Sequence, residues 1–207
     1  MTRYDDTAHQ FAGVDYSLNT SKGILNFDTK AKYYKCLNEV LQTPGFEMSI
    51  KNSAGNIQDG WLVADGSQTT YYDIIGLSCT TDDHTKLSAF EQITGIDILW
   101  VHKKTLLDYI EQYTSIEQLK YDAKMLRECY DRGESYDIID IVINGDNTPK
   151  TRKYYTHRKF HLTYSPALEE QPVNLVVYRD VLQSLEHARH WTVTKNYVKN
   201  EINGNVL

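Results

Sequence analysis

Long apolar runs are absent from this chain of 207 residues. No stretch approaches the roughly 18 consecutive apolar residues that a membrane-spanning helix needs. The opening segment, MTRYDDTAHQ, is polar and acidic rather than an apolar signal segment. These two absences argue against a membrane partner and against export, so we expect a cytoplasmic protein.

Cysteine is scarce as well. Cys36, Cys79 and Cys129 lie far apart and form no CxxC pair. Such usage is typical of buried thiols in a reducing compartment and argues against a disulfide framework. Because no cysteine lies beside them, two close pairs of histidines do not predict a zinc site: His157/His161 and His187/His190.

An excess of positive charge is missing. Lys and Arg number 22 against 28 Asp and Glu, a formal net charge of −6, which argues against a nonspecific coat for DNA. One segment reverses this balance and is either a phosphate-contacting surface or a solvated face. Its basic residues are Lys150, Arg152, Lys153, His157, Arg158 and Lys159, interleaved with Tyr154 and Tyr155.

Proline is limited to four positions, and no repeat or low-complexity segment divides the chain. A hydrophobic fraction of 41% with 24% charged residues is ordinary for a folded soluble domain, so we expect one domain over residues 1–207. The periodicity predicts a hairpin over 11–34, helices over 31–42, 104–113, 115–132 and 178–190, and strands over 46–51, 61–64, 69–80, 95–101, 136–144, 152–164 and 172–177. These elements predict an α/β protein in which helices flank one mixed central sheet.

The hairpin carries the residues that suggest chemistry. Asp15 lies on its first strand, and Asp28 and Lys30 lie on its second strand. Residues two apart in a strand share a face, so Asp28 and Lys30 project together and pairing of the strands brings Asp15 beside them. Two carboxylates and the Thr29 backbone carbonyl offer hard oxygen ligands for Mg²⁺ or Mn²⁺. Two carboxylates this close repel each other, so we expect Asp28→Asn to be neutral or stabilising without metal.

The order GVD, short loop, then an apolar-flanked D-x-K resembles the signature of the PD-(D/E)XK nuclease superfamily, over roughly residues 10–112. The resemblance implies a restriction-endonuclease-like core there, built from a helix, a three-stranded meander, a helix and a strand, with residues 113–207 as an α/β extension. It also implies Asp15 and Asp28 as metal ligands, Lys30 as a catalytic group, and DNA as the substrate. The sequence leaves open whether the chain forms a homodimer.

Further candidates lie outside the hairpin. Glu47 is a candidate additional metal ligand or water-orienting group, and Lys51 on the same strand face a candidate phosphate contact. The alternative for both is an ordinary strand-surface charge. Tyr71, Tyr72 and Trp61 either stack on bases or are half-buried aromatics of a sheet.

Two other classes of function remain. The first is a noncatalytic module that keeps the nuclease-like fold and binds nucleic acid or protein. It is favoured by the short segment before the hairpin, where the family has a helix. Val14, in place of the family's frequent proline, is a second departure from the motif. The second is an unrelated α/β domain whose charges coincide with the motif.

Overall fold

The computed structural model describes residues 1–3, 12–34, 44–79, 93–133, 139–143, 149–155, 159–194 and 198–200. The chain forms two compact units, each assembled from segments that are distant in sequence. Unit 1 comprises Met1–Gln42, Gln68–Leu106 and Arg179–Leu207, and unit 2 comprises Thr43–Ser67 and Leu107–Tyr178. The expected division into a core and an extension near residue 112 coincides with neither unit.

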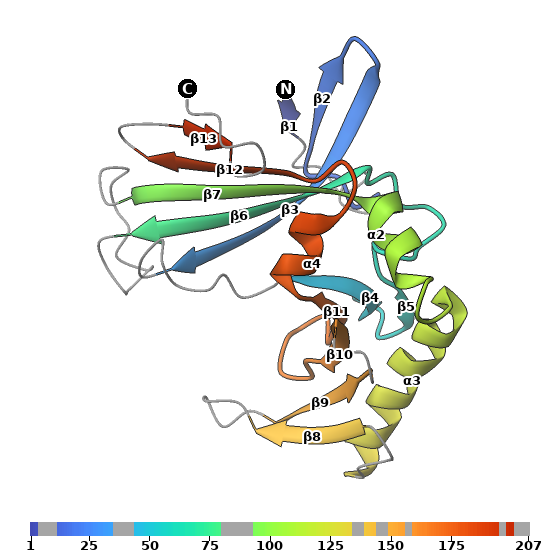
Figure 1. Ribbon diagram of the computed structural model, residues 1–207. Coiled ribbons are helices and arrows are strands. Elements are labelled where there is room, and N and C mark those ends of the chain that lie inside the picture. The colour runs from blue at the N-terminus through green and yellow to red at the C-terminus, as the bar shows by residue number, and fades with distance from the viewer. Residues whose placement is uncertain are drawn as a thin grey trace. The chain divides into compact units, whose positions relative to one another are not determined.

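Unit 1 contains a seven-stranded mixed sheet in the order β1-β2-β3-β6-β7-β12-β13. Its strands are β1 (Thr2–Arg3), β2 (Tyr16–Thr20), β3 (Gly23–Tyr34), β6 (Tyr71–Cys79), β7 (Ile93–His102), β12 (Arg189–Thr194) and β13 (Val198–Asn200). The strands β3, β6, β7 and β12 lie side by side (Figure 1). Only the pairing of β3 with β6 is parallel among the described strands of this sheet.

The centre of this sheet is formed by strands whose buried residues alternate. In β7 the buried positions include Asp97, Leu99 and Val101, and the residues between them are half-buried. Because successive side chains of a strand point to opposite faces, one row of β7 packs in the core. The buried row contains one charged residue, Asp97, which therefore needs a partner.

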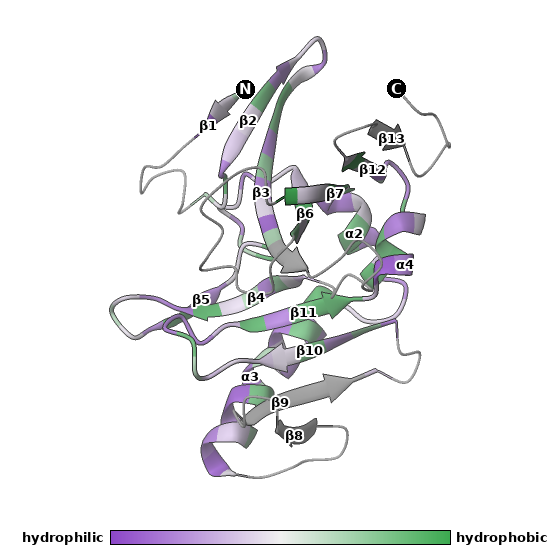
Figure 2. Cartoon of the chain, turned by 90° about the vertical axis from the view of Figure 1, so that its left-hand side faces the viewer, coloured by the Kyte–Doolittle hydropathy of each residue, from purple (hydrophilic) through white to green (hydrophobic). Residues whose placement is uncertain are grey.

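Unit 2 contains a six-stranded antiparallel sheet in the order β5-β4-β11-β10-β9-β8. Its strands are β4 (Gly45–Lys51), β5 (Ile57–Asp59), β8 (Ile139–Ile143), β9 (Pro149–Tyr154), β10 (Phe160–Tyr164) and β11 (Val173–Val177). β11 is coloured largely as hydrophobic in Figure 2, in agreement with its fully buried residues Val173, Leu175 and Val177.

Helix α3 (Ile116–Arg132) packs against the sheet of unit 2. Its hydrophobic and hydrophilic residues alternate along the helix (Figure 2), as the 3.6-residue period of one buried face requires. The Ser115 hydroxyl accepts a hydrogen bond from the Gln118 N–H, and Gly133 ends the helix with a φ of 66°. Both ends agree with the predicted helix over 115–132. The two other described helices are α2 (Lys103–Ile110) and α4 (Arg179–Ser184).

The α/β class and a mixed sheet are confirmed, whereas the expectation of one sheet is wrong because the strands form two sheets. After β3, the next strand along the chain, β4, lies in the other sheet, and β3 pairs with β6 instead. The described residues therefore do not form the consecutive three-stranded meander that the family resemblance implies. No helix within the described ranges has the length and apolar character needed to cross a membrane.

Four predicted elements differ from the structure. Residues 31–34, predicted as the start of a helix, continue β3, and residues 35–42 lie outside the described residues. Residues 61–64 form a turn, because the N–H groups of Val63 and Ala64 both donate to the Gly60 carbonyl. The strand predicted over 152–164 is divided into the antiparallel pair β9 and β10. The helix predicted over 178–190 ends at Ser184, before His187 takes a φ of 65°, and β12 follows.

Candidate active site

The β2–β3 hairpin forms as the sequence predicts, with pairs from Tyr16↔Phe27 to Thr20↔Gly23. Asp15, expected on the first strand, instead immediately precedes β2, and two hydrogen bonds hold it against β3. Its N–H donates to the Phe27 carbonyl at 2.8 Å. Its carboxylate Oδ2 accepts from the Thr29 N–H at 2.7 Å. Asp15 is therefore fixed beside the D-x-K segment while its side chain stays exposed to solvent.

Asp28 and Lys30 face the same side of β3 and form an ion pair, with 3.0 Å between Lys30 Nζ and Asp28 Oδ2. Asp28 is only 6% exposed, and its neighbour on β6, Tyr72, is fully buried. The pairing predicted for the hairpin and the shared face of these two residues are thus confirmed. An ion pair in this environment is electrostatically stronger than one in water.

A further lysine, which sequence reasoning did not single out, acts on the same carboxylate. Lys103 is the first residue of α2, and its N–H donates to the Thr70 carbonyl at 2.9 Å. Burial lowers the pKa of Lys103 to about 8, although the charge of Asp28 opposes that change. The charges of two lysines therefore act on one buried aspartate.

This arrangement reverses the expected effect of Asp28→Asn on stability. That expectation requires repulsion between the carboxylates of Asp15 and Asp28 to be the largest electrostatic effect on stability at this position. In the structure, Asp28 has the Lys30 ammonium at 3.0 Å, and Asp15 is stabilised by the Thr29 N–H. Removing the charge of Asp28 therefore removes an attraction.

Aromatic residues fix the hairpin to the sheet. Phe27 is fully buried and stacks on Tyr16, with ring centroids 4.7 Å apart and an interplanar angle of 2°. Its centroid lies 5.5 Å from that of Tyr71 and 4.9 Å from that of Trp100. The Tyr16 hydroxyl donates to Asp73 Oδ2 at 2.7 Å, and burial, with this hydrogen bond, raises the pKa of Tyr16. The side chains of the hairpin strands therefore alternate between aromatic residues of the core and polar residues of the candidate site.

The remaining candidates lie in unit 2 or outside the described residues. Glu47 and Lys51 lie on β4, so the structure does not bring them together with Asp15, Asp28 and Lys30 inside one unit. Arg152 and Lys153 lie on β9, between β10 and β8 in the sheet. Arg158 lies outside the described residues, as does His157. Among the aromatic candidates, Tyr72 is fully buried, whereas Tyr71 and Trp61 are half-buried.

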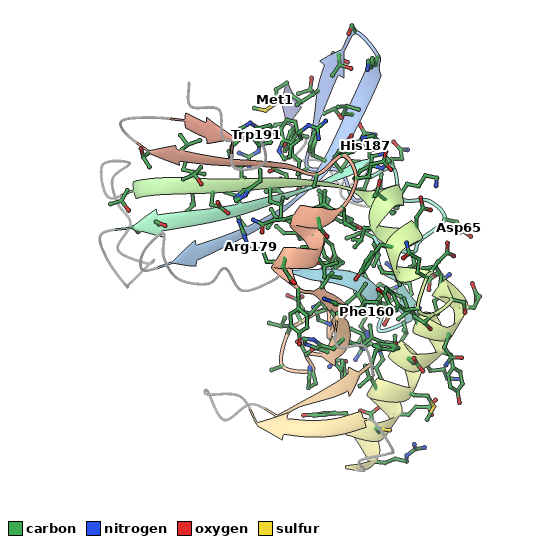
Figure 3. All side chains as sticks on the ribbon, viewed as in Figure 1. Met1, Asp65, Phe160, Arg179, His187 and Trp191 are labelled. Atoms are coloured by element: carbon green, nitrogen blue, oxygen red, sulfur yellow. The ribbon has the colours of Figure 1, made fainter. Side chains whose placement is uncertain are left out.

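A second polar cluster in unit 1 joins α4, β7 and β12. His190 Nε2 lies 2.6 Å from Asp97 Oδ1, and Arg179 Nη2 forms an ion pair with Asp97 Oδ2. The Gln183 amide nitrogen lies 3.0 Å from His190 Nδ1. Figure 3 labels Arg179 at the start of α4 and Trp191 on β12.

The charge state of Asp97 follows from this cluster. Burial by itself would raise the pKa of Asp97, but the hydrogen bond from His190 and the charge of Arg179 outweigh it, and the pKa is lowered. Asp97 is 8% exposed, as is His190. The signal in the sequence was one aspartate inside the otherwise apolar run GIDILWV, where a buried charge requires compensation.

The hairpin offers an incomplete set of metal ligands by itself. Within the described ranges, no group of three or more His, Cys, Asp or Glu side chains could hold a metal ion. Mg²⁺, however, is commonly bound by one or two carboxylates, with water and substrate phosphate completing its coordination. The donor set of Asp15, Asp28 and the Thr29 carbonyl fits that mode, because all of its members are hard oxygen ligands.

Comparisons with known proteins identify no relative. No family model matches the chain, and neither a curated protein nor a solved structure matches it.

Proposed function

We propose that this protein is a metal-dependent nuclease that hydrolyses phosphodiester bonds of DNA at the β2–β3 hairpin. The observation that carries the proposal is the placement of Asp28, a nearly buried aspartate with the Lys30 ammonium at 3.0 Å. Beside it, the Asp15 carboxylate accepts a hydrogen bond of 2.7 Å from the N–H of Thr29, the residue between Asp28 and Lys30. A carboxylate pair with an adjacent ammonium suits chemistry on a phosphodiester, where negative charge increases in the transition state.

Each residue then has a separate role. Asp15, Asp28 and the Thr29 carbonyl would hold Mg²⁺ or Mn²⁺. When bound, the ion supplies Lewis-acid activation of the phosphate and lowers the pKa of a bound water. Lys30 orients the attacking water and stabilises charge on the nonbridging oxygens, because its ammonium is already fixed beside Asp28. Lys103, whose charge interacts with that of Asp28, adds positive charge that favours the approach of an anionic substrate.

One observation favours a noncatalytic module as the second candidate. Asp28 is neutralised by Lys30, and Asp15 accepts the Thr29 N–H, so this group of residues is stable without a metal. Such a module would keep the hairpin for its structural value and bind nucleic acid or protein elsewhere. The two candidates differ in metal binding, because only the nuclease needs it.

Asp28→Asn separates these candidates. We expect this variant to bind Mn²⁺ at least tenfold more weakly in calorimetric titration, because a charged ligand is lost. We also expect its free energy of unfolding without metal to fall by about 2 kcal/mol, within the usual range of destabilising substitutions, because the ionic attraction between Asp28 and Lys30 is lost. Asp65→Asn, at an exposed position, is the matched control for both measurements. Equal Mn²⁺ affinity in wild type and Asp28→Asn would contradict the proposed site.

The basic strand β9 provides a test of DNA binding that is independent of chemistry. We expect Arg152→Ala and Lys153→Ala to weaken DNA binding and to leave the rate of the chemical step unchanged. The logarithm of the association constant decreases linearly with the logarithm of the salt concentration. If each residue neutralises one phosphate, the magnitude of this slope decreases by about 0.9 per substitution. Fluorescence anisotropy at several salt concentrations measures this slope, and Lys22→Ala, in the exposed turn of the hairpin, is the control. An unchanged slope would remove β9 from the DNA-binding surface.

A further inference from the structure

Unit 2 contains a pocket with a volume of about 1010 Å³, comparable with the upper range of small-molecule sites. Its wall is formed by residues of β4, β5, α3 and the end of β10. An apolar part of the wall includes Met48, Ile57 and Tyr130, and Ile57 is 54% exposed. A polar part includes Lys51 and Arg127, and the carboxylates of Asp59, Glu128 and Asp131 also line the wall. The pocket therefore combines a surface for an organic group with positive charge.

Arg127 is the distinctive residue of this wall because it is a buried cation, only 7% exposed. Its Nη2 donates to the Ser49 carbonyl at 3.1 Å and to the Ser49 hydroxyl at 3.1 Å. The guanidinium carbon lies 4.8 Å from the centroid of the Tyr164 ring. Arg127 is thus positioned by neutral groups, and its Nη1 makes no hydrogen bond to a described residue.

No carboxylate within the described ranges forms an ion pair with Arg127, and the same holds for Lys51. Burial lowers the pKa of Arg127, as expected for a desolvated cation, while Tyr164 and the charge of Asp131 oppose that change. The two other lysines of the wall are already engaged. Lys120 Nζ lies 2.7 Å from Asp59 Oδ2, and Lys124 Nζ lies 3.8 Å from Glu128 Oε1.

Lys51 and Arg127 are both positioned by β4. Ser49 and Lys51 are two residues apart on β4 and both contribute to the wall, as residues on one strand face do. Ser49 holds Arg127, so Arg127 and Lys51 lie against the same stretch of β4. Two cations that share a pocket match a doubly charged phosphate better than a singly charged carboxylate.

We infer that the pocket of unit 2 binds a phosphate monoester of nucleotide size, with its phosphate at Lys51 and Arg127 and its organic part against Met48, Ile57 and Tyr130. The bound phosphate would accept a hydrogen bond from Arg127 Nη1, which makes none to a described residue. The pocket shares no residue with the proposed nuclease site, whose Asp15, Asp28 and Lys30 belong to unit 1.

Calorimetric titration of the whole chain with adenosine monophosphate, inorganic phosphate and adenosine tests the inference. We expect adenosine monophosphate to bind more tightly than either of the other two probes. Lys51→Ala should weaken its binding at least about tenfold, the effect of losing one charge-assisted contact. Arg127→Lys keeps the charge but loses the planar fork that reaches Ser49, and should also weaken binding. Lys22→Ala should bind as the wild type does.

Three results would overturn the inference. Wild-type protein that binds neither phosphate nor adenosine monophosphate would exclude the site, as would unchanged affinity in Lys51→Ala. That variant is informative even if Arg127→Lys does not fold, because Lys51 is only half-buried at the end of β4. Displacement of adenosine monophosphate by an oligonucleotide without a terminal phosphate would contradict a monoester site and assign the pocket to backbone phosphates of nucleic acid.

Discussion

Asp97→Asn is expected to lower the free energy of unfolding by about 3 kcal/mol, the scale for removing one partner of a buried ion pair. The carboxylate has His190 Nε2 at 2.6 Å and the Arg179 guanidinium on its other oxygen. Asparagine keeps the size of the side chain but cannot compensate the charge of Arg179. Urea unfolding followed by tryptophan fluorescence measures the change, since Trp100 and Trp191 lie on the adjoining strands β7 and β12.

The pH dependence provides a second readout of the same cluster. The pKa of Asp97 is lowered in the folded chain, so its stabilising contribution is complete above the unfolded pKa of about 4 and is lost as the pH falls through the folded pKa. We expect Asp97→Asn to lack this part of the acid destabilisation. Asp180→Asn, at an exposed position of α4, is the control. A loss below about 0.5 kcal/mol in Asp97→Asn, the range of ordinary surface substitutions, would show that the cluster is not stabilising.

Lys30→Ala is expected to slow DNA cleavage at least about 10²-fold, the scale for losing a positioned electrostatic or acid–base group. Metal affinity should change little, because lysine is not a ligand in the proposed site. Single-turnover cleavage at saturating protein measures the chemical step, and calorimetry with Mn²⁺ measures binding of the ion.

Lys30→Arg provides the matched comparison. Its planar guanidinium cannot occupy the position of a compact ammonium 3.0 Å from Asp28 Oδ2, so we expect no recovery of the rate. A wild-type rate in Lys30→Ala would contradict the assigned role. A fall of equal size in the control Lys22→Ala would show that the effect is not specific to the site.

The local features of the hairpin could be predicted because they depend on neighbouring residues. The alternation of Asp28 and Lys30 about Thr29 follows from strand periodicity, and the turn at residues 21–22 allows β2 to pair with β3. The capped helix α3 was predictable for the same reason, since Ser115 and Gly133 mark its ends. The strand conformation of residues 31–34 could not be predicted, because their parallel pairing with β6 involves residues more than forty positions away.

The partners of buried charges depend on tertiary contacts and were missed. Asp97 and His190 are 93 positions apart, and no local pattern connects them. Arg127 follows the apolar positions Leu119, Ala123 and Leu126 of α3, and its place on that buried face could have been recognised from the helical period. Its neighbour Ser49 on β4 could not have been recognised, because that contact spans 78 residues.

Cleavage of supercoiled plasmid DNA by the wild-type chain is the most direct test of the proposed nuclease activity. The reaction is followed with Mg²⁺, with Mn²⁺ and with excess EDTA, beside Asp28→Asn purified in the same way. We expect nicked or linear DNA with either ion, none with EDTA, and at least about a 10²-fold slower reaction in the variant. Plasmid that stays supercoiled with both ions, or equal cleavage by wild type and Asp28→Asn, would contradict metal-dependent hydrolysis at the β2–β3 hairpin.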